Sequence, residues 1–328
     1  MWVDSAVRDE IVQTMAVYRA QTGIPVRKLL AWIELNPGKF YDWQARLNEP
    51  NRHNGIIPKT HWLLSWERQA IIDYAARHDS EGYRRLTFEL IDADVVYASP
   101  SSVYRVLKDA GLLAKFTAAE NRKGTGYVQP TAPHQEWHTD VSYVNVCGTF
   151  MFLITVLDGF SRYIVHHELR TSMERWDVIL VVQWAHEKFP DVKPRVISDH
   201  GGPYIAREFK EYLRLAGLKQ TLISANYPES NGKMERFYKT IKGECIRRSS
   251  FLSISDARRI IAEFIVYYND KRLHSALDYI APLNVLNGKR EEIKKMRYEK
   301  LAMARVKRSE YYNRFSTLNP TPVLSDSR

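Results

Sequence analysis

The N-terminal residues 1–50 carry apolar side chains at helical spacing. The first repeat of this kind is formed by Ile11, Met15 and Tyr18. Apolar residues three or four positions apart predict an amphipathic helix. Asn36 before Pro37 is typical of a helix N-cap and first turn, so another short helix is expected there. Short helices joined by tight turns predict a helix-turn-helix unit over residues 1–50.

A second all-helical unit is expected over residues 60–115. Ser99-Pro100 favours the start of its last helix, and Gly111 favours the end. The stretches before and after this unit, residues 50–59 and 120–129, are polar and contain glycine or proline, which predicts linkers.

From residue 134 the pattern changes to the alternation of β-strands. Strands are expected over 137–146, 149–157, 163–168, 194–198 and 219–223, and helices over 173–189, 205–215 and 228–247. Three hairpin strands followed by alternating helices and strands are typical of a mixed α/β sheet. The order resembles the ribonuclease H-like plan, and the core is expected to span residues 130–287.

Composition and charge narrow the class of protein. The chain is 45% hydrophobic and 26% charged, which excludes disorder as its overall state. Its two cysteines exclude a disulfide scaffold, and neither a membrane span nor a secretory signal is expected, so a cytoplasmic protein is predicted. The formal net charge is +10, and residues 241–328 carry a net +8 of it. Residues 288–328 are therefore predicted to form a basic helical tail, either as a grip on DNA or as a solvated helix surface.

Three acids lie where they suggest chemistry. Asp140 falls inside the first strand, Asp199 ends a short strand, and Glu235 lies early in the last long helix of the core. An acid within an apolar strand is costly unless it has a partner, and a divalent metal ion is a natural one. Two such ions can hold the attacking and leaving oxygens of a phosphoryl transfer.

The spacing of these acids does not by itself identify them as a catalytic set. Thirty-five residues lie between Asp199 and Glu235, and roughly one such pair is expected by chance in this composition. Lys239 and Lys242 follow Glu235 one and two turns along the same helix, so this helix is predicted to lie against a phosphodiester.

Four motifs together resemble a known family. They are Trp137-His-Thr-Asp140, Ser198-Asp-His-Gly201, Asn231-Gly-Lys-Met-Glu-Arg236 and Tyr267-Tyr-Asn-Asp-Lys-Arg-Leu-His274. They resemble the integrase catalytic core, and more closely bacterial insertion-sequence transposases whose catalytic protein is the second of two overlapping reading frames. The resemblance covers about residues 130–290, and more weakly the segments 36–43 and 81–113.

The resemblance implies an activity. Asp140, Asp199 and Glu235 would hold two Mg²⁺ ions, for which Mn²⁺ can substitute. The enzyme would nick DNA at the 3′ ends of its element and join them to another phosphodiester by 3′-hydroxyl attack, with no covalent enzyme–DNA link. The implied partners are double-stranded DNA (terminal inverted repeats and target), further copies of the chain in the DNA complex, and a first-frame protein. A nucleoid-associated location follows.

The chain departs from relatives in two places. No cysteine precedes Cys147, so the zinc module of retroviral integrases is not expected. Ala281-Pro282 stands where the family usually has Thr-Pro, which affects a surface turn.

Candidate DNA contacts complete the picture. They are Lys39 and Arg46 for one groove, Arg105 and Lys108 for the backbone, and Asn231, Lys239 and Lys242 near the acids. The alternative for the N-terminal helices is a small bundle whose aromatic residues form a core. The alternatives for the whole chain are a non-catalytic DNA-binding protein and a ribonuclease H-like nuclease that only hydrolyses.

Overall fold

The computed structural model describes residue 3 and residues 5–49, 62–78, 82–113, 129–223 and 232–318. The chain divides into two units, residues 1–59 and 60–328. The predicted linker 50–59 and residues 120–128 of the second linker lie outside the described residues. In the described part, no helix is both long and apolar enough to cross a bilayer.

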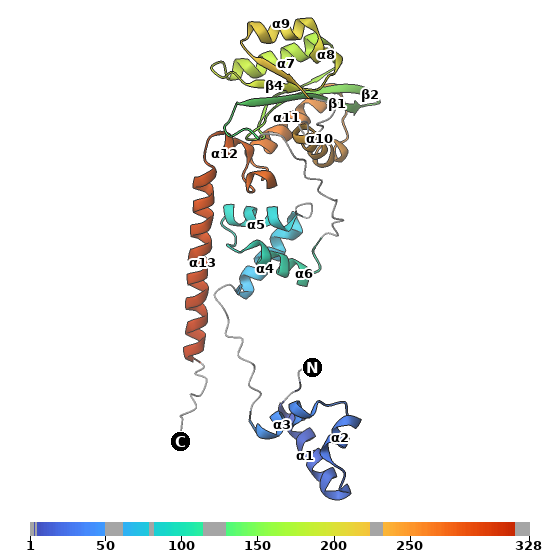
Figure 1. Ribbon diagram of the computed structural model, residues 1–328, viewed down its shortest axis with the longest axis vertical. Coiled ribbons are helices and arrows are strands. Elements are labelled where there is room, and N and C mark those ends of the chain that lie inside the picture. Colours follow the sequence, from blue (N-terminus) through green and yellow to red (C-terminus); the bar gives the residue numbers. More distant parts are fainter. Residues whose placement is uncertain are drawn as a thin grey trace. The chain divides into compact units, whose positions relative to one another are not determined.

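The first unit is all-helical, as its periodicity predicts. Its helices are α1 (Ser5–Thr22), α2 (Val26–Trp32) and α3 (Pro37–Ala45) (Figure 1). The Asn36 side chain accepts hydrogen bonds from the backbone N–H groups of Gly38 (2.8 Å) and Lys39 (3.4 Å), which confirms the predicted cap. Phe40 and Trp43 of α3 are buried in the core of this unit.

The second helical group opens the larger unit. It comprises α4 (Ser65–Arg77), α5 (Tyr83–Asp92) and α6 (Pro100–Asp109), which share a core of aliphatic residues. Ser99 caps α6 by accepting the N–H of Ser102 at 3.2 Å. Gly111, with φ of +69°, follows α6 in the left-handed region that glycine tolerates best.

The core contains a five-stranded mixed sheet. Its strands are β1 (Glu136–Val146), β2 (Thr149–Asp158), β3 (Ile164–Arg170), β4 (Arg195–Ser198) and β5 (Lys219–Leu222). They lie in the order β3-β2-β1-β4-β5. The first three pair antiparallel, whereas β4 pairs parallel with both β1 and β5. Asp158 forms the predicted turn after β2: its buried carboxylate accepts the N–H groups of His134 and Ser161, both at 2.7 Å.

Helices cover both faces of this sheet. On one face lie α7 (Arg175–Lys188), α8 (Gly202–Ile205) and α9 (Arg207–Leu215), and on the other α10 (Gly232–Glu244) and α11 (Ile254–Asp270). Side chains alternate along β1, so Trp137 packs toward α7 while Val144 packs toward α10 and α11. This is the ribonuclease H-like α/β fold. The helix predicted over 205–215 is interrupted at Ala206, whose ψ of 143° is extended, so α8 and α9 are separate.

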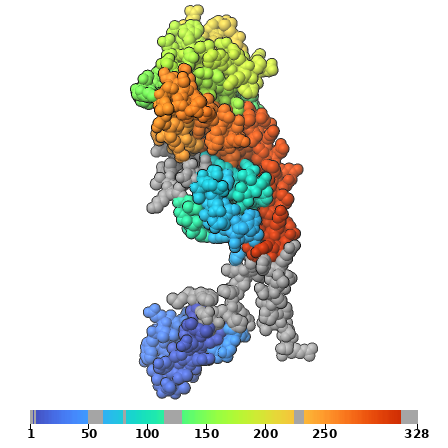
Figure 2. Space-filling model, turned by 180° about the vertical axis from the view of Figure 1, so that it is seen from behind, coloured from blue at the N-terminus to red at the C-terminus, as the bar shows by residue number. Residues whose placement is uncertain are grey.

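The basic C-terminal region forms one long helix. After α12 (Pro282–Leu286), α13 (Arg290–Leu318) lies against the α4–α6 group (Figures 1 and 2). Arg297 forms two hydrogen bonds to Asp92, at 2.8 and 2.6 Å, and Arg308 two to Glu67, at 2.8 and 2.7 Å. The expectation of a basic tail that grips DNA is therefore wrong for these two arginines, because both are buried in internal ion pairs.

Candidate active site

Asp140 and Asp199 lie at the same level of the sheet. The parallel pairing of β1 with β4 matches His138 with Ile197, and the two aspartates stand two residues farther along each chain segment. Neighbouring strands are about 4.8 Å apart, and a step of two residues returns to the same face. Both aspartates are half-buried. The fold thus brings together two predicted site residues that are far apart in sequence.

Helix α10 is tied to the backbone of Asp140. The buried Tyr238 hydroxyl donates to the Asp140 carbonyl oxygen at 2.6 Å and also lies 3.3 Å from the Leu153 carbonyl oxygen. Glu235 precedes Tyr238 by three residues, about one helical turn, and its side chain is exposed. The helix that carries Glu235 is therefore held on the sheet face beside Asp140.

Two buried tyrosines lie within the field of both aspartates. The Tyr204 hydroxyl lies 3.3 Å from Thr139 Oγ1. Burial raises the pKa of Tyr204, and the negative charges of Asp140 and Asp199 raise it further. Burial likewise raises the pKa of Tyr238, with the same two carboxylates adding to it. Both phenols therefore stay protonated, so the two tyrosines near the aspartates are neutral.

The turn after β4 orients Asp199. Its Oδ1 accepts the N–H of Gly201 at 2.8 Å, so the carboxylate folds over that glycine. A Cβ atom at Gly201 would lie 2.9 Å from the same oxygen, closer than a real side chain tolerates. Glycine at this position therefore allows the carboxylate to take this orientation.

The fit of these acids to a metal ion is partial. Among the residues that the structure describes, no three His, Cys, Asp or Glu side chains gather closely enough to hold a metal. The grouping of Glu235 with Asp140 and Asp199 around a metal ion therefore stays a prediction. Mg²⁺ is commonly held by one or two carboxylates together with water and substrate phosphate, which the aspartate pair fits.

The motif from Tyr267 to His274 braces the core. The Asn269 side chain accepts the N–H of Ile164 at 2.8 Å and donates to its carbonyl oxygen at 3.1 Å, which fixes the start of β3. Arg272 forms two hydrogen bonds to Glu244 at the end of α10, at 2.7 and 2.6 Å. The motif thus contacts both the start of β3 and the end of α10.

The candidate DNA contacts of the first unit are engaged locally. The Lys39 ammonium lies 5.0 Å from the Trp43 ring centroid, and Arg46 pairs with Asp42 one turn earlier in the same helix region. Both basic side chains are half-buried. Each of the two side chains contacts a residue of α3, and their contact with DNA stays a prediction.

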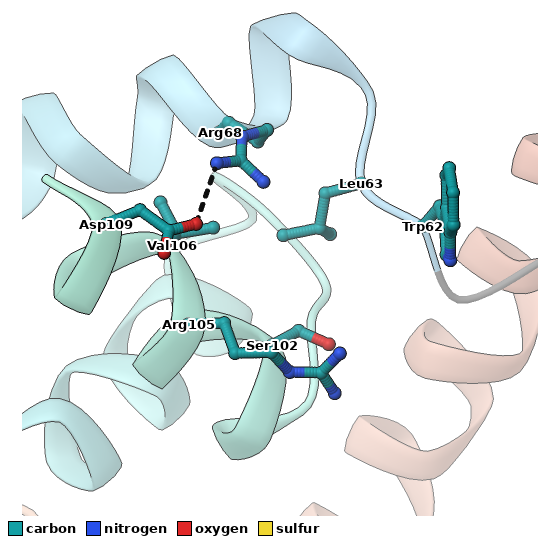
Figure 3. A pocket seen from close by; sticks show the side chains of 7 residues that line it. All are labelled: Trp62, Leu63, Arg68, Ser102, Arg105, Val106 and Asp109. Carbon is teal, nitrogen blue, oxygen red and sulfur yellow. Dashed lines mark hydrogen bonds and ion pairs between the residues drawn. The ribbon is translucent and has the colours of Figure 1, made fainter. Parts of the chain in front are cut away.

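Arg105 and Lys108 are exposed on α6. Arg105 lines a cavity of about 330 Å³ together with Trp62 and Leu63, and an ion pair of 3.2 Å between Arg68 and Asp109 lies at its side (Figure 3). The Arg105 Nε donates to the Ser101 carbonyl oxygen at 3.2 Å, which keeps this side chain along its helix.

The three candidates near Glu235 differ in their placement. Lys239 is exposed and lines a wide basic cleft, whereas Lys242 is half-buried and does not line it. Asn231 lies outside the described residues. The hydroxyl contacts of Tyr204 and Tyr238 were not anticipated, because an aromatic residue on the apolar face of an element signals only a core position.

Comparison with known proteins identifies the family. Residues 130–228 and 216–282 each match the integrase core domain. The transposase for insertion sequence element IS904 of Lactococcus lactis subsp. lactis (strain IL1403) is 31% identical, over 49% of this chain and 68% of that protein. The transposase for insertion sequence element IS629 of Shigella sonnei is 24% identical, over 78% and 90%.

A solved structure, the simian T-cell lymphotropic virus intasome in complex with PP2A regulatory subunit B56 gamma, gives a TM-score of 0.45 at 14% identity, over 66% of this chain and 74% of that one. The sheet order and the two family matches, rather than this overlap, establish the fold. With an integrase core and a relative of 31% identity, the chain belongs to the family of bacterial insertion-sequence transposases.

Proposed function

We propose that this transposase nicks DNA at the 3′ ends of its element and then joins those ends to target DNA, with Asp140, Asp199 and Glu235 as the catalytic residues. The observation that carries the proposal is the parallel register of β1 and β4, which brings Asp140 of β1 level with Asp199, the residue directly after β4. Glu235, one turn from the Tyr238 anchor, is the third acid available there.

The aspartate pair is suited to a divalent cation. Two carboxylates at one level of a sheet repel each other, and a cation between them relieves that repulsion. Asp140 and Asp199 would hold Mg²⁺, with Glu235 as a further ligand and with Mn²⁺ as a substitute. When bound, two such ions stabilise the attacking and leaving oxygens of a phosphoryl transfer.

The two reactions balance without a covalent enzyme intermediate. In the nick, a water oxygen forms a bond to phosphorus, the 3′-oxygen leaves and takes a proton, and a free 3′-hydroxyl results. In strand transfer, that 3′-hydroxyl oxygen forms a bond to a target phosphorus while the bond from that phosphorus to the target's 3′-oxygen breaks. The proton lost by the attacking hydroxyl is balanced by the one that the leaving oxygen takes up, so a new phosphodiester and a free target 3′-hydroxyl result. The chain's own part is to orient the Asp199 carboxylate through the Gly201 N–H and to hold the Asp140 backbone through the Tyr238 hydroxyl.

The DNA partners are proposed to be the terminal inverted repeats and the target. Lys39 and Arg46 would read the repeat, and Arg105 and Lys108 would contact its backbone, with further copies of the chain and a first-frame protein completing the complex. Each good base contact contributes about 1–3 kcal/mol of discrimination. Lys39→Ala with Arg46→Ala should therefore reduce the preference for the terminal repeat over random duplex, as measured by competition binding.

The test is cleavage and strand transfer on a duplex that carries the terminal repeat, with Mg²⁺ or with EDTA. Asp140→Asn, Asp199→Asn and Glu235→Gln should each lower the cleavage rate about 1,000-fold, because the charge they remove supports several kcal/mol of transition-state stabilisation. Asp191→Asn, an exposed acid of the same core, is the matched control and should cleave normally.

The outcomes separate the possibilities. Near wild-type cleavage by any of the three variants refutes the assignment of that acid, and cleavage in EDTA refutes metal dependence. Hydrolysis without strand transfer would instead indicate a nuclease. Lys242→Ala should weaken DNA binding and leave metal affinity unchanged.

A further inference from the structure

A basic cleft lies within the larger unit, beside the helix that carries Glu235. Its volume is about 920 Å³. It is lined from three directions: the start of α5, the exposed side of α10, and the segment that follows α11. The cationic side chains that line it are Arg84, Arg85, Arg236, Lys239 and Arg272, and Glu244 is the one carboxylate among its lining residues.

The carboxylate of Glu244 does not neutralise the positive charge of this cleft. Glu244 is bound by Arg272 through two short hydrogen bonds and lies 4.0 Å from Arg85. Burial raises the pKa of Glu244, but the Arg272 guanidinium outweighs it and holds that pKa below its usual value. The carboxylate is therefore ionised and engaged at one end of the cleft.

Arg236 and Lys239 are the available cations. Both are exposed on α10, and neither side chain forms a hydrogen bond or ion pair within the described part of the chain. Arg84, from α5, is also exposed, and it stacks its guanidinium 5.6 Å from the Tyr83 ring centroid. Segments about 150 residues apart in the chain thus present positive charge to one space.

A neutral histidine completes the lining. Burial, together with the charges of Arg272, Arg162, Arg85 and Arg236, lowers the pKa of His274 to about 3. Its Nδ1 is buried and has no hydrogen-bond partner among the described residues. A neutral imidazole surrounded by guanidinium groups is a ready donor, in the appropriate tautomer, to an anionic oxygen.

We propose that this cleft binds the phosphodiester backbone of the DNA strand that the enzyme cleaves. The inference rests on the proposed function, which it extends to a binding site. Arg236 directly follows Glu235 and Gly243 lies two turns beyond it, so the α10 side of the cleft extends from beside Glu235 to about 12 Å along the helix. One DNA strand carries a phosphate about every 3.4 Å of axis. The cleft thus corresponds to the first to about the fourth phosphate from the cleaved one.

The first experiment measures binding to duplex DNA in EDTA, so that it does not depend on cleavage. Arg236→Gln with Lys239→Gln removes two cations, and the slope of log K against log salt should fall by about 2. Lys210→Gln with Arg214→Gln, a pair of exposed residues on α9 across the sheet, removes the same charge and should leave the slope within half a unit. Equal slopes for the two double variants would overturn the proposal.

The second experiment locates the strand. A neutral methylphosphonate at the first to fourth phosphate from the cleavage point should weaken binding to the wild type severalfold and leave binding to Arg236→Gln/Lys239→Gln unchanged. The same modification ten nucleotides away is the control. If the effect occurs on terminal-repeat duplex, the cleaved end occupies the cleft. An effect confined to random target duplex would overturn that assignment.

The failure of each idea is distinguishable. Loss of cleavage by the wild type with the slope difference intact refutes the proposed chemistry alone. Normal cleavage with no slope difference refutes the cleft alone. Arg84→Gln should lower the slope by about 1, and an unchanged slope would remove α5 from the site.

Discussion

Replacing Arg308 by methionine tests how α13 is held against the α4–α6 group. The Arg308 and Glu67 side chains are only 5% and 6% exposed. Arg308 donates to both carboxylate oxygens of Glu67, at 2.8 and 2.7 Å, and to the Tyr97 carbonyl oxygen at 2.7 Å. The substitution leaves the Glu67 charge buried without its cation.

Breaking one side of a buried ion pair costs about 3–5 kcal/mol. Glu67 keeps one hydrogen bond, from the Leu64 N–H at 2.8 Å, at the positive end of α4. We therefore expect a loss near the lower limit, about 3 kcal/mol in the free energy of unfolding of this helical group. Arg305→Met, an exposed position on the same helix, should change it by less than about 0.5 kcal/mol.

The assay is urea unfolding combined with amide hydrogen exchange of residues 62–113. Glu67→Gln in the Arg308→Met background removes the stranded charge, so the double variant should be more stable than Arg308→Met alone. A loss below about 1 kcal/mol for Arg308→Met, or a double variant no more stable than the single one, would refute the reasoning.

Three other predictions follow from the site and the sheet. Tyr238→Phe removes the hydroxyl that binds the Asp140 and Leu153 carbonyl oxygens, so it should cost about 1–2 kcal/mol of stability in urea unfolding and lower the cleavage rate at saturating DNA without changing DNA affinity. Gly201→Ala should reduce cleavage while preserving the melting temperature within a few degrees, because a Cβ 2.9 Å from Asp199 Oδ1 displaces that carboxylate; unchanged cleavage would contradict this orientation. Burial lowers the pKa of His167 to about 4 from its usual 6.5, so the unfolded chain binds more protons between these values, and stability should be complete above pH 6.5 and decline as the pH falls toward 4. The decline, roughly 2–3 kcal/mol, should be absent from the His167→Gln variant in the same unfolding measurements.

Local sequence determined the elements of this protein. Asn36 and Ser99 mark helix starts, because their side-chain oxygens accept backbone N–H groups only one turn away. The alternating residues of β1 predict a strand, and the motif around Asp199 predicts a strand end. Such signals depend on neighbours in sequence, so no knowledge of the fold is required.

The tertiary structure alone decided which distant residues meet. Asp140 and Asp199 align because β1 and β4 pair in one particular parallel register, and that register depends on the packing of the whole sheet. The basic count of the C-terminal region predicted DNA contact, yet Arg297 and Arg308 pair with acids more than 200 residues away. The number of charged residues in a sequence does not show which groups they contact. Whether a cationic side chain binds a phosphate or a carboxylate depends on which surface the fold places against it.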